Sequence, residues 1–199
     1  MLVVTVDQRA SRRTADHVDE LLAWLSGRAP VVRPFERTAG DEVQGLLDTP
    51  SDVVRLSLDL VRAGGWSIGI GVGAVREPLP VSTRAGHGPA FTHARAAVTR
   101  AKHRPTGLAV SGDRPRPSAD AEAVLDLLAT VVARRSRHGW EAVDLAAQGL
   151  SQAQIGQRLG ISKQAVSQRL AAAEWHLDGP GRTAGAHLLS EADGRLLPP

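Results

Sequence analysis

Two aspartates near the start of the chain are placed where carboxylates often do metal chemistry. Asp7 ends the apolar run VVTVD, and Asp41 lies between two short apolar runs in the stretch FERTAGDEVQGLLD. If these runs are strands of one sheet, both carboxylates can converge near one end of it. Such a pair can hold Mg²⁺ or Ca²⁺ with the phosphates of a nucleotide. The alternative for Asp41 is structural, because Gly-Asp is a favoured tight turn.

A second stretch, LSQAQIGQRLGISKQAVSQRL at residues 150–170, has the pattern of two short helices joined by a sharp turn. Ser151 and Ser162 are suitable N-caps, and Gly160 suits a left-handed turn. Gly156 is small where a second helix must cross closely. The stretch resembles the helix-turn-helix of bacterial transcription factors, and this resemblance implies binding to double-stranded DNA.

The second helix of this pair is expected to bury Val166 and Leu170 and to present polar side chains on its other side. Glutamine can pair with adenine in the major groove, and lysine or arginine can reach guanine or phosphate. Residues 134–173 contain six basic and two acidic side chains, an excess that phosphate contact requires. The alternative is a helical module that contacts only protein. The predicted DNA-binding residues are Ser162, Lys163, Gln164, Ser167, Gln168 and Arg169.

The elements that must position these residues follow from hydrophobic periodicity. Strands are predicted at residues 2–6, 31–37, 43–47, 66–75 and 108–110, and helices at 14–26, 50–63 and 88–103. This β-α-β-β-α-β-α-β order is typical of a ferredoxin-like sheet with its helices packed on one face. The glycines of GIGVG lie inside a predicted strand and lack the lysine of a phosphate loop, so we expect them to allow close packing.

The stretch SGDRPRPSAD, residues 111–120, is the predicted domain boundary. We expect an α+β protein, with a ferredoxin-like domain at 1–112 and an all-α domain at 118–199 whose helix-turn-helix covers about 151–173. Ser118 is expected to cap a long helix. The apolar stripe of this helix could pack within the chain, against the DNA-binding helices, or against a second subunit. The stripe comprises Ala121, Val124, Leu125, Leu128, Val131 and Val132.

Three segments of the first domain, RTAGDEVQGLL, WSIGIGVGAV and GPAFTHARAAVTRA, resemble successive motifs of class III nucleotidyl cyclases and, more distantly, of GGDEF diguanylate cyclases. The opening VDQRASRR also looks like the start of the SatD family of small bacterial proteins. The resemblance implies a nucleotidyl cyclase-like domain in which Asp7 and Asp41 bind the metal. It places Arg37 where cyclases have the lysine that selects the base.

The positions that complete the reaction in cyclases differ in this chain. Thr92 stands at the position of the cyclase asparagine, and Ala96 at that of the arginine that stabilises the transition state. Arg95 is adjacent, but one residue turns a helical side chain by about 100°. The resemblance therefore implies a domain that binds a nucleotide or cyclic nucleotide without turning it over, and no catalytic residue is predicted. The predicted ligand-binding residues are Asp7, Arg37, Asp41, Thr92 and Arg95.

Composition narrows the remaining possibilities. The chain has 199 residues, a formal net charge of +3 and no cysteine, which excludes disulfides and thiolate metal sites. Its seven histidines show no zinc-ligand spacing. We expect neither a signal peptide nor a membrane span, and we predict a cytoplasmic location.

Together these features favour a DNA-binding transcriptional regulator, rather than an enzyme, that forms a homodimer. Its cyclase-like domain would serve for dimerisation, nucleotide sensing or both. The alternative is an active nucleotidyl cyclase, or another metal-dependent nucleotide-processing enzyme, with an accessory helical tail. A third possibility is a nucleotide-responsive adaptor whose helical tail binds protein. Mg²⁺ or Ca²⁺ is expected only together with a nucleotide.

Overall fold

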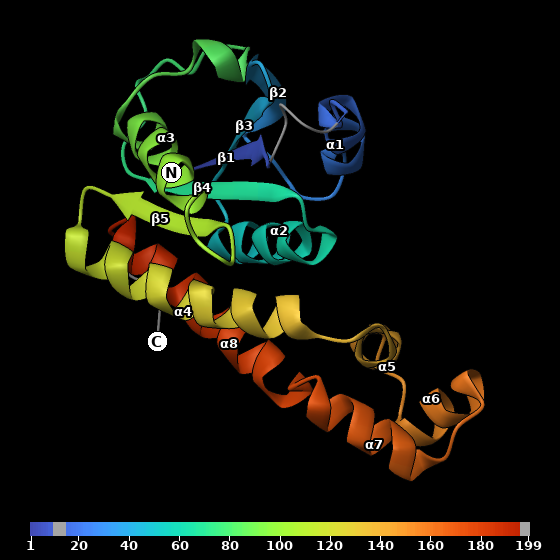
Figure 1. Ribbon diagram of the computed structural model, residues 1–199. Coiled ribbons are helices and arrows are strands. Elements are labelled where there is room, and N and C mark those ends of the chain that lie inside the picture. Colours follow the sequence, from blue (N-terminus) through green and yellow to red (C-terminus); the bar gives the residue numbers. More distant parts are fainter. Residues whose placement is uncertain (10–14, 196–199) are drawn as a thin grey trace.

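The computed structural model describes residues 1–9 and 15–195, which form a mixed α and β structure with a five-stranded sheet (Figure 1). The strands are β1 (Leu2–Gln8), β2 (Arg33–Ala39), β3 (Glu42–Leu47), β4 (Trp66–Val72) and β5 (Leu108–Gly112). The helices are α1 (Val18–Leu25), α2 (Pro50–Ala63), α3 (Pro89–Ala101), α4 (Pro115–Arg134), α5 (Arg137–Ala147), α6 (Gln152–Leu159), α7 (Lys163–Ala172) and α8 (Trp175–Ala192), with a short 3-10 turn η1 (Thr83–Ala85).

β1 lies at the centre of the sheet, whose strand order is β2-β3-β1-β4-β5. It pairs antiparallel with both β3 and β4, and β4 pairs parallel with β5. The Gly40-Asp41 pair makes the predicted turn between β2 and β3, with Gly40 at a φ of 55°. The predicted order of strands and helices as far as β5 is confirmed.

The helices cover both faces of the sheet, so the prediction that they pack on one face was wrong. Val4 and Val6 of β1 share a core with apolar residues of α1 and α2. Val3 points to the other face, because side chains alternate along a strand, and it packs with Ala90 and Ala94 of α3. Figure 1 shows α3 and α2 on opposite sides of the strands. Hydrophobic periodicity identified these helices but could not assign each one to a face.

Two glycines of β4 allow α3 to lie directly on the strand. A Cβ atom on Gly69 would stand 2.2 Å from the backbone nitrogen of Val98, and one on Gly71 would stand 2.1 Å from the carbonyl oxygen of Ala90. Any larger residue would therefore push the helix away from the sheet. The interpretation of GIGVG as a close-packing sequence is confirmed.

α4 and α8 pack together against the sheet and α2, and they bury much of the predicted apolar stripe within the chain. Leu125 and Ala129 of α4 are fully buried in the same core as Leu189 of α8. The predicted start of this helix was wrong, because α4 begins at Pro115 and Ser118 lies inside it. Proline suits the first turn of a helix, where its missing N–H would have no partner anyway.

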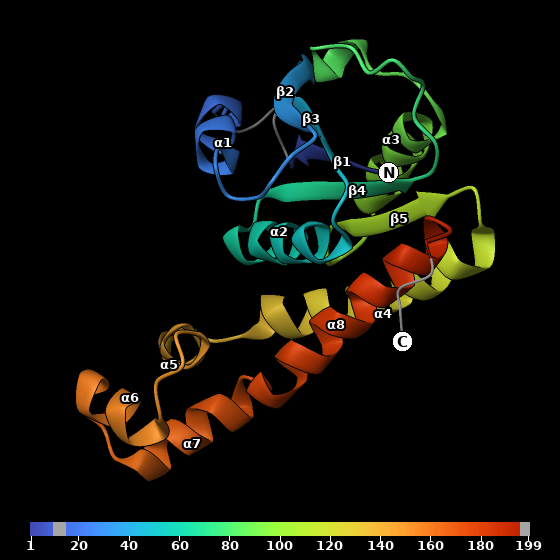
Figure 2. The same ribbon diagram turned by 180° about the vertical axis from the view of Figure 1, so that it is seen from behind.

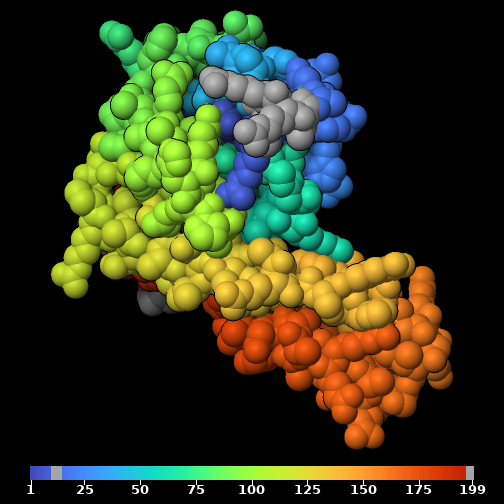
Figure 3. Space-filling view, in the orientation of Figure 1, coloured from blue at the N-terminus to red at the C-terminus, as the bar shows by residue number. Residues whose placement is uncertain are grey.

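α5, α6 and α7 surround a second, smaller hydrophobic core that includes Val143, Ile155 and Val166. These helices extend away from the sheet (Figure 2), and they form the lower lobe of the molecule in the space-filling view (Figure 3). α4 and α8 contribute instead to the core of the sheet. The described residues therefore form two hydrophobic cores, one built on the sheet with α4 and α8 and one within α5–α7.

Candidate nucleic-acid interface and candidate ligand pocket

The segment from α6 to α7 is built by local interactions that the sequence predicts. Ser151 and Gln154 form a reciprocal capping box at the start of α6. Gly160 ends this helix in the left-handed conformation, with φ 66° and ψ 33°. The side chain of Ser162 then accepts a hydrogen bond of 3.1 Å from the backbone nitrogen of Ala165 and caps α7. The predicted caps and turn residue are confirmed.

The angle between α6 and α7 is fixed by a close contact and a shared core. A Cβ atom on Gly156 would stand 2.8 Å from the carbonyl oxygen of Ile161, so only glycine lets the turn pass this near to α6. Ile155 and Val166 are fully buried between the helices, and Leu170 is nearly so. α7 is therefore held rigidly, with its other side facing outward.

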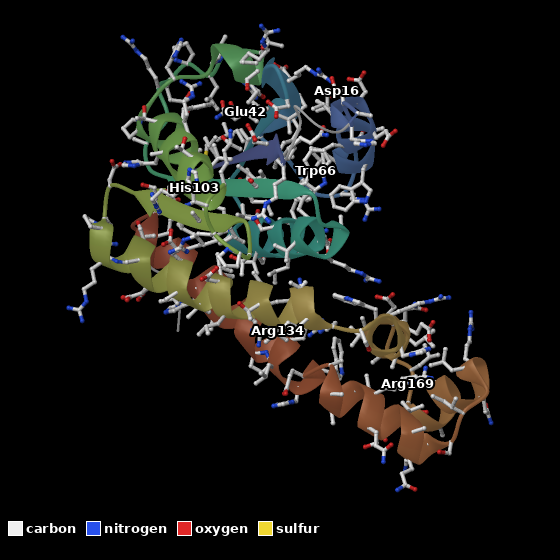
Figure 4. The ribbon with its side chains drawn as sticks, viewed as in Figure 1. Asp16, Glu42, Trp66, His103, Arg134 and Arg169 are labelled. Carbon is white, nitrogen blue, oxygen red and sulfur yellow. The ribbon has the colours of Figure 1, made fainter. Side chains whose placement is uncertain are left out.

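The outward side of α7 carries polar side chains that the structure leaves available. Lys163, Gln164, Ser167 and Gln168 are exposed, and their side chains make no hydrogen bond or ion pair within the described part of the chain. Arg169 differs from them, because its Nη1 lies 3.3 Å from Oε2 of Glu141 on α5. Figure 4 labels Arg169. Of the predicted DNA-binding residues, Arg169 is thus the one that also ties α7 to α5.

The carboxylates at the end of the sheet are arranged differently. Asp7 is 5 % exposed and lies opposite Glu42 in the pairing of β1 with β3. Its Oδ2 accepts an ion-pair contact of 2.7 Å from Nζ of Lys102, which follows α3. Burial raises the pKa of the Asp7 carboxyl, Lys102 opposes this, and the charges of Asp41 and Glu42 raise the pKa further. The structure therefore brings Asp7 and Asp41 near each other, as expected, but with an unforeseen lysine beside them.

A divalent metal ion at Asp7 would have to share this carboxylate with Lys102 or displace the lysine. Lys102 already supplies the positive charge that a cation would bring to Asp7. Residues 1–9 and 15–195 contain no group of three or more His, Cys, Asp or Glu side chains placed to hold a metal. Ca²⁺ takes six to eight oxygen ligands, whereas Mg²⁺ is often held by one or two carboxylates together with waters and the phosphates of its substrate. We therefore derive no metal-dependent chemistry from Asp7 and Asp41.

Arg37 does not join these carboxylates. Its guanidinium group lies 2.8 Å from Asp16 and 3.2 Å from Asp19 at the start of α1. In the sheet Arg37 is paired with Val43, and directly paired residues share a face, so it belongs to the face that carries α1. Arg37 in turn lowers the pKa of the Asp16 carboxyl. The sequence pattern located the strand but not the acidic partners that hold the side chain.

Thr92 and Arg95 come together on the other face, in the wall of a pocket of about 430 Å³ next to the β2–β3 hairpin. Glu42 also lines this pocket, and its Oε1 accepts a hydrogen bond of 2.7 Å from the hydroxyl of Thr38. Two of the predicted ligand residues thus line this pocket, whereas Arg37 belongs to the opposite face of the same hairpin. Ser11, Arg12 and Arg13 of the SatD-like opening lie outside the described residues.

No protein-family model matches this chain, and neither the curated proteins nor the solved structures contain a match. In the part of the chain that the structure describes, no helix has the length and apolar character needed to cross a membrane.

Proposed function

We propose that the protein is a sequence-specific DNA-binding transcriptional regulator in which α7 is the recognition helix. The observation that carries this proposal is the exposed polar side of α7, held outward by the Gly160 turn and the Ile155 core. A ferredoxin-like, cyclase-like N-terminal domain would serve for dimerisation, nucleotide sensing or both. The proposed DNA-contacting residues are Ser162, Lys163, Gln164, Ser167 and Gln168.

The side-chain chemistry of α7 supports this proposal. Gln164 and Gln168 are four residues apart, so they lie one above the other on the same side of the helix. Each has the donor and acceptor needed to pair with an adenine edge in the major groove. Lys163 is in the first turn, where the positive end of the helix dipole also attracts phosphate. Residues near the start of a recognition helix are the ones that usually contact bases.

Arg169 has a different role in this proposal. Because it forms an ion pair with Glu141, a base contact by Arg169 would require that pair to be given up. We assign Arg169 to holding α7 on α5, and we assign phosphate contact to Lys163. A homodimer would present two copies of α7 to a DNA site with two-fold symmetry.

The proposal is tested by selecting sites for the full-length chain from a random double-stranded DNA library. We expect an enriched sequence that contains adenines at fixed positions. Gln164→Ala should weaken the free energy of binding to the selected site by about 1–3 kcal/mol and relax the sequence preference at one base pair. Lys163→Ala should weaken binding to all DNA sequences to the same extent. It should also reduce the slope of log affinity against log salt concentration by about one.

Arg116→Ala is the matched control, because it also removes one exposed positive charge but lies on α4. It should leave both the selected sequence and the salt slope unchanged. Failure of the native chain to enrich any sequence at low salt would contradict the proposal. If Gln164→Ala and Lys163→Ala enriched the same sequence with the same affinity as the wild type, the role of α7 would be contradicted.

A further inference from the structure

A cavity of about 470 Å³ lies where the part of the molecule built on the sheet meets the α5–α7 lobe, apart from both sites described above. Its walls come from the end of β1, the last turn of α2, the start of β4, the last turn of α4 and the start of α5. Figure 4 labels Trp66, which lines this cavity, and Arg134, the neighbour of the lining residue Arg135. Pockets that bind small molecules have volumes of this order.

The lining is cationic and aromatic. It includes the residues Arg9, Arg62, Arg135, Trp66 and Trp140. Among the described residues, none of those that line it is acidic. Val61 and Val132 add apolar surface. An arginine fork fits a carboxylate or phosphate, so this combination suits a ligand with an anionic head and an apolar body.

Arg135 is the most unusual of these side chains, because only 2 % of it is exposed. Its Nη2 donates to Oδ1 of Asp178 at 2.6 Å, and its Nε donates to the carbonyl oxygen of Ala173 at 2.8 Å. Its Nη1 has no hydrogen-bond partner in the described part of the chain. Asp178 also accepts from Arg182 at 2.6 Å, so one carboxylate balances two guanidinium groups. The Arg135 guanidinium also lies 4.8 Å from the centre of the Trp140 ring, so Arg135 supports the wall of the cavity from within the core.

Arg9 and Arg62 supply the remaining positive charge. Arg9 donates from Nη2 to the carbonyl oxygen of Arg104 at 2.7 Å, and the described residues give it no carboxylate partner. Arg62 contacts both oxygens of Asp144 at 2.6 and 2.7 Å and lies 3.8 Å from the centre of the Trp140 ring. Of the three arginines, Arg62 is therefore the one with a carboxylate partner that it does not share within the described residues.

We propose that this cavity binds a small organic anion, whose carboxylate or phosphate is held by Arg9 and Arg62 and whose apolar part lies against Trp66 and Val132. The site differs from the predicted nucleotide site in position and in every residue. It lies where the end of α2 meets α5. It therefore joins the two hydrophobic cores of the molecule.

Because of the position of the cavity, a bound anion can change the affinity for DNA. This part of the inference rests on the proposed function. Arg62 belongs to α2, whereas Asp144 and Trp140 belong to α5. A bound anion would compete with Asp144 for Arg62 and so favour a different position of α5. Coupling requires the ligand to bind the two arrangements with different affinity.

The test uses the full-length chain and three probes, namely inorganic phosphate, benzoate and phenyl phosphate, with benzyl alcohol as the neutral comparison. Binding is followed by calorimetry and by tryptophan fluorescence, since Trp66 and Trp140 line the cavity. We expect saturable binding of phenyl phosphate or benzoate, and the stronger of the two identifies the head group. Equal binding of benzyl alcohol, or no saturable binding of any anion at millimolar concentration, would overturn the proposal.

Ala133→Glu is the decisive variant, because Ala133 lines the cavity and is exposed, so the fold has no reason to change. Its carboxylate would occupy the anion site and should weaken binding by at least about tenfold. Ala133→Gln has nearly the same shape without the charge and should bind more tightly than Ala133→Glu. Arg9→Gln should also weaken binding. Equal affinity of the Glu and Gln variants would overturn the proposed site.

The affinity for the selected DNA is measured separately, with and without phenyl phosphate. If phenyl phosphate changes the DNA affinity of the wild type but not that of Ala133→Glu, the result would support coupling through the cavity. An unchanged DNA affinity with saturable anion binding would contradict the coupling and support the site. A chain that binds the anion but no DNA would contradict the proposed function alone.

Discussion

The exposed side of α7 and the carboxylate end of the sheet were both predicted to bind ligands, and the structure treats them in opposite ways. On α7 the polar side chains of Lys163, Gln164 and Gln168 are exposed and make no contacts of their own within the described residues. At the sheet, Asp7 is paired with Lys102, and Arg37 is paired with Asp16. Polar groups that satisfy one another stabilise a fold, whereas groups left open on a rigid helix are available to a partner.

The largest expected effect tests the sheet side of this comparison. Gly71→Val places side-chain atoms where the backbone of Ala90 and Ala94 lies, so α3 must move away from β4. We expect the free energy of unfolding to fall by about 3 kcal/mol or more. Urea denaturation followed by circular dichroism measures this change.

Gly179→Ala is the control, because nothing lies within 4 Å of a Cβ atom there and the residue is inside α8. It should leave stability unchanged or raise it by about 0.5–1 kcal/mol. A Gly71→Val protein as stable as the wild type would show that α3 does not depend on contact with the strand.

The next effect tests whether the helical lobe is held by its own core. Ile155→Ala removes a fully buried side chain from the α5–α7 core and should cost this lobe about 2–5 kcal/mol. Hydrogen exchange should accelerate in α5, α6 and α7 and remain slow in β1 and β4. DNA binding should be lost with it.

Leu127→Ala is the matched control, since the Leu127 side chain is 69 % exposed on α4. It should change stability by no more than about 0.5 kcal/mol. Equal acceleration of exchange in the sheet and the lobe after Ile155→Ala would mean that the two cores unfold as one.

The smallest effect concerns Asp7 and depends on pH. Burial raises the pKa of this carboxyl above its ordinary value of 3.8, so ionising it disfavours the folded state. Stability from this group is present at pH values below the ordinary pKa and is lost as the pH rises through the raised one. Asp7→Asn should therefore stabilise the protein near neutral pH by less than about 1 kcal/mol, since Lys102 offsets part of the burial.

The gain from Asp7→Asn should disappear in acid, where the wild-type carboxyl is protonated. Thermal melts at several pH values measure it. Lys102→Gln should act in the opposite direction near neutral pH, because it removes the ion-pair partner of Asp7. If Asp7→Asn instead destabilised the protein at neutral pH, the ion pair would be a stabilising feature of the fold.

Features that depend on neighbours in the chain were predicted well. The caps at Ser151 and Ser162, the left-handed Gly160 and the Gly40-Asp41 turn are satisfied within a few residues, so local rules suffice for them. Ser118 is the exception, because local rules allow both a serine cap and an N-terminal proline, and the chain uses Pro115.

Features that depend on distant pairs were missed. The sequence gives no indication that Lys102 meets Asp7 or that Asp16 holds Arg37, because these partners are brought together only by the sheet and its helices. The cavity lined by Arg9, Arg62 and Arg135 was missed for the same reason. A scan for buried arginine could not have found it, since arginines are normally exposed.

The sequence by itself determined the order of strands and helices as far as β5, the caps at which α6 and α7 begin, and which side of α7 is polar. These properties depend on periodicity and on capping residues close together in the chain. Only the tertiary structure decided that α3 covers the opposite face of the sheet from α2, that Lys102 pairs with Asp7, and that three arginines line one cavity. The physical reason is that burial and charge pairing depend on which surfaces meet, and residues far apart in the chain make those surfaces.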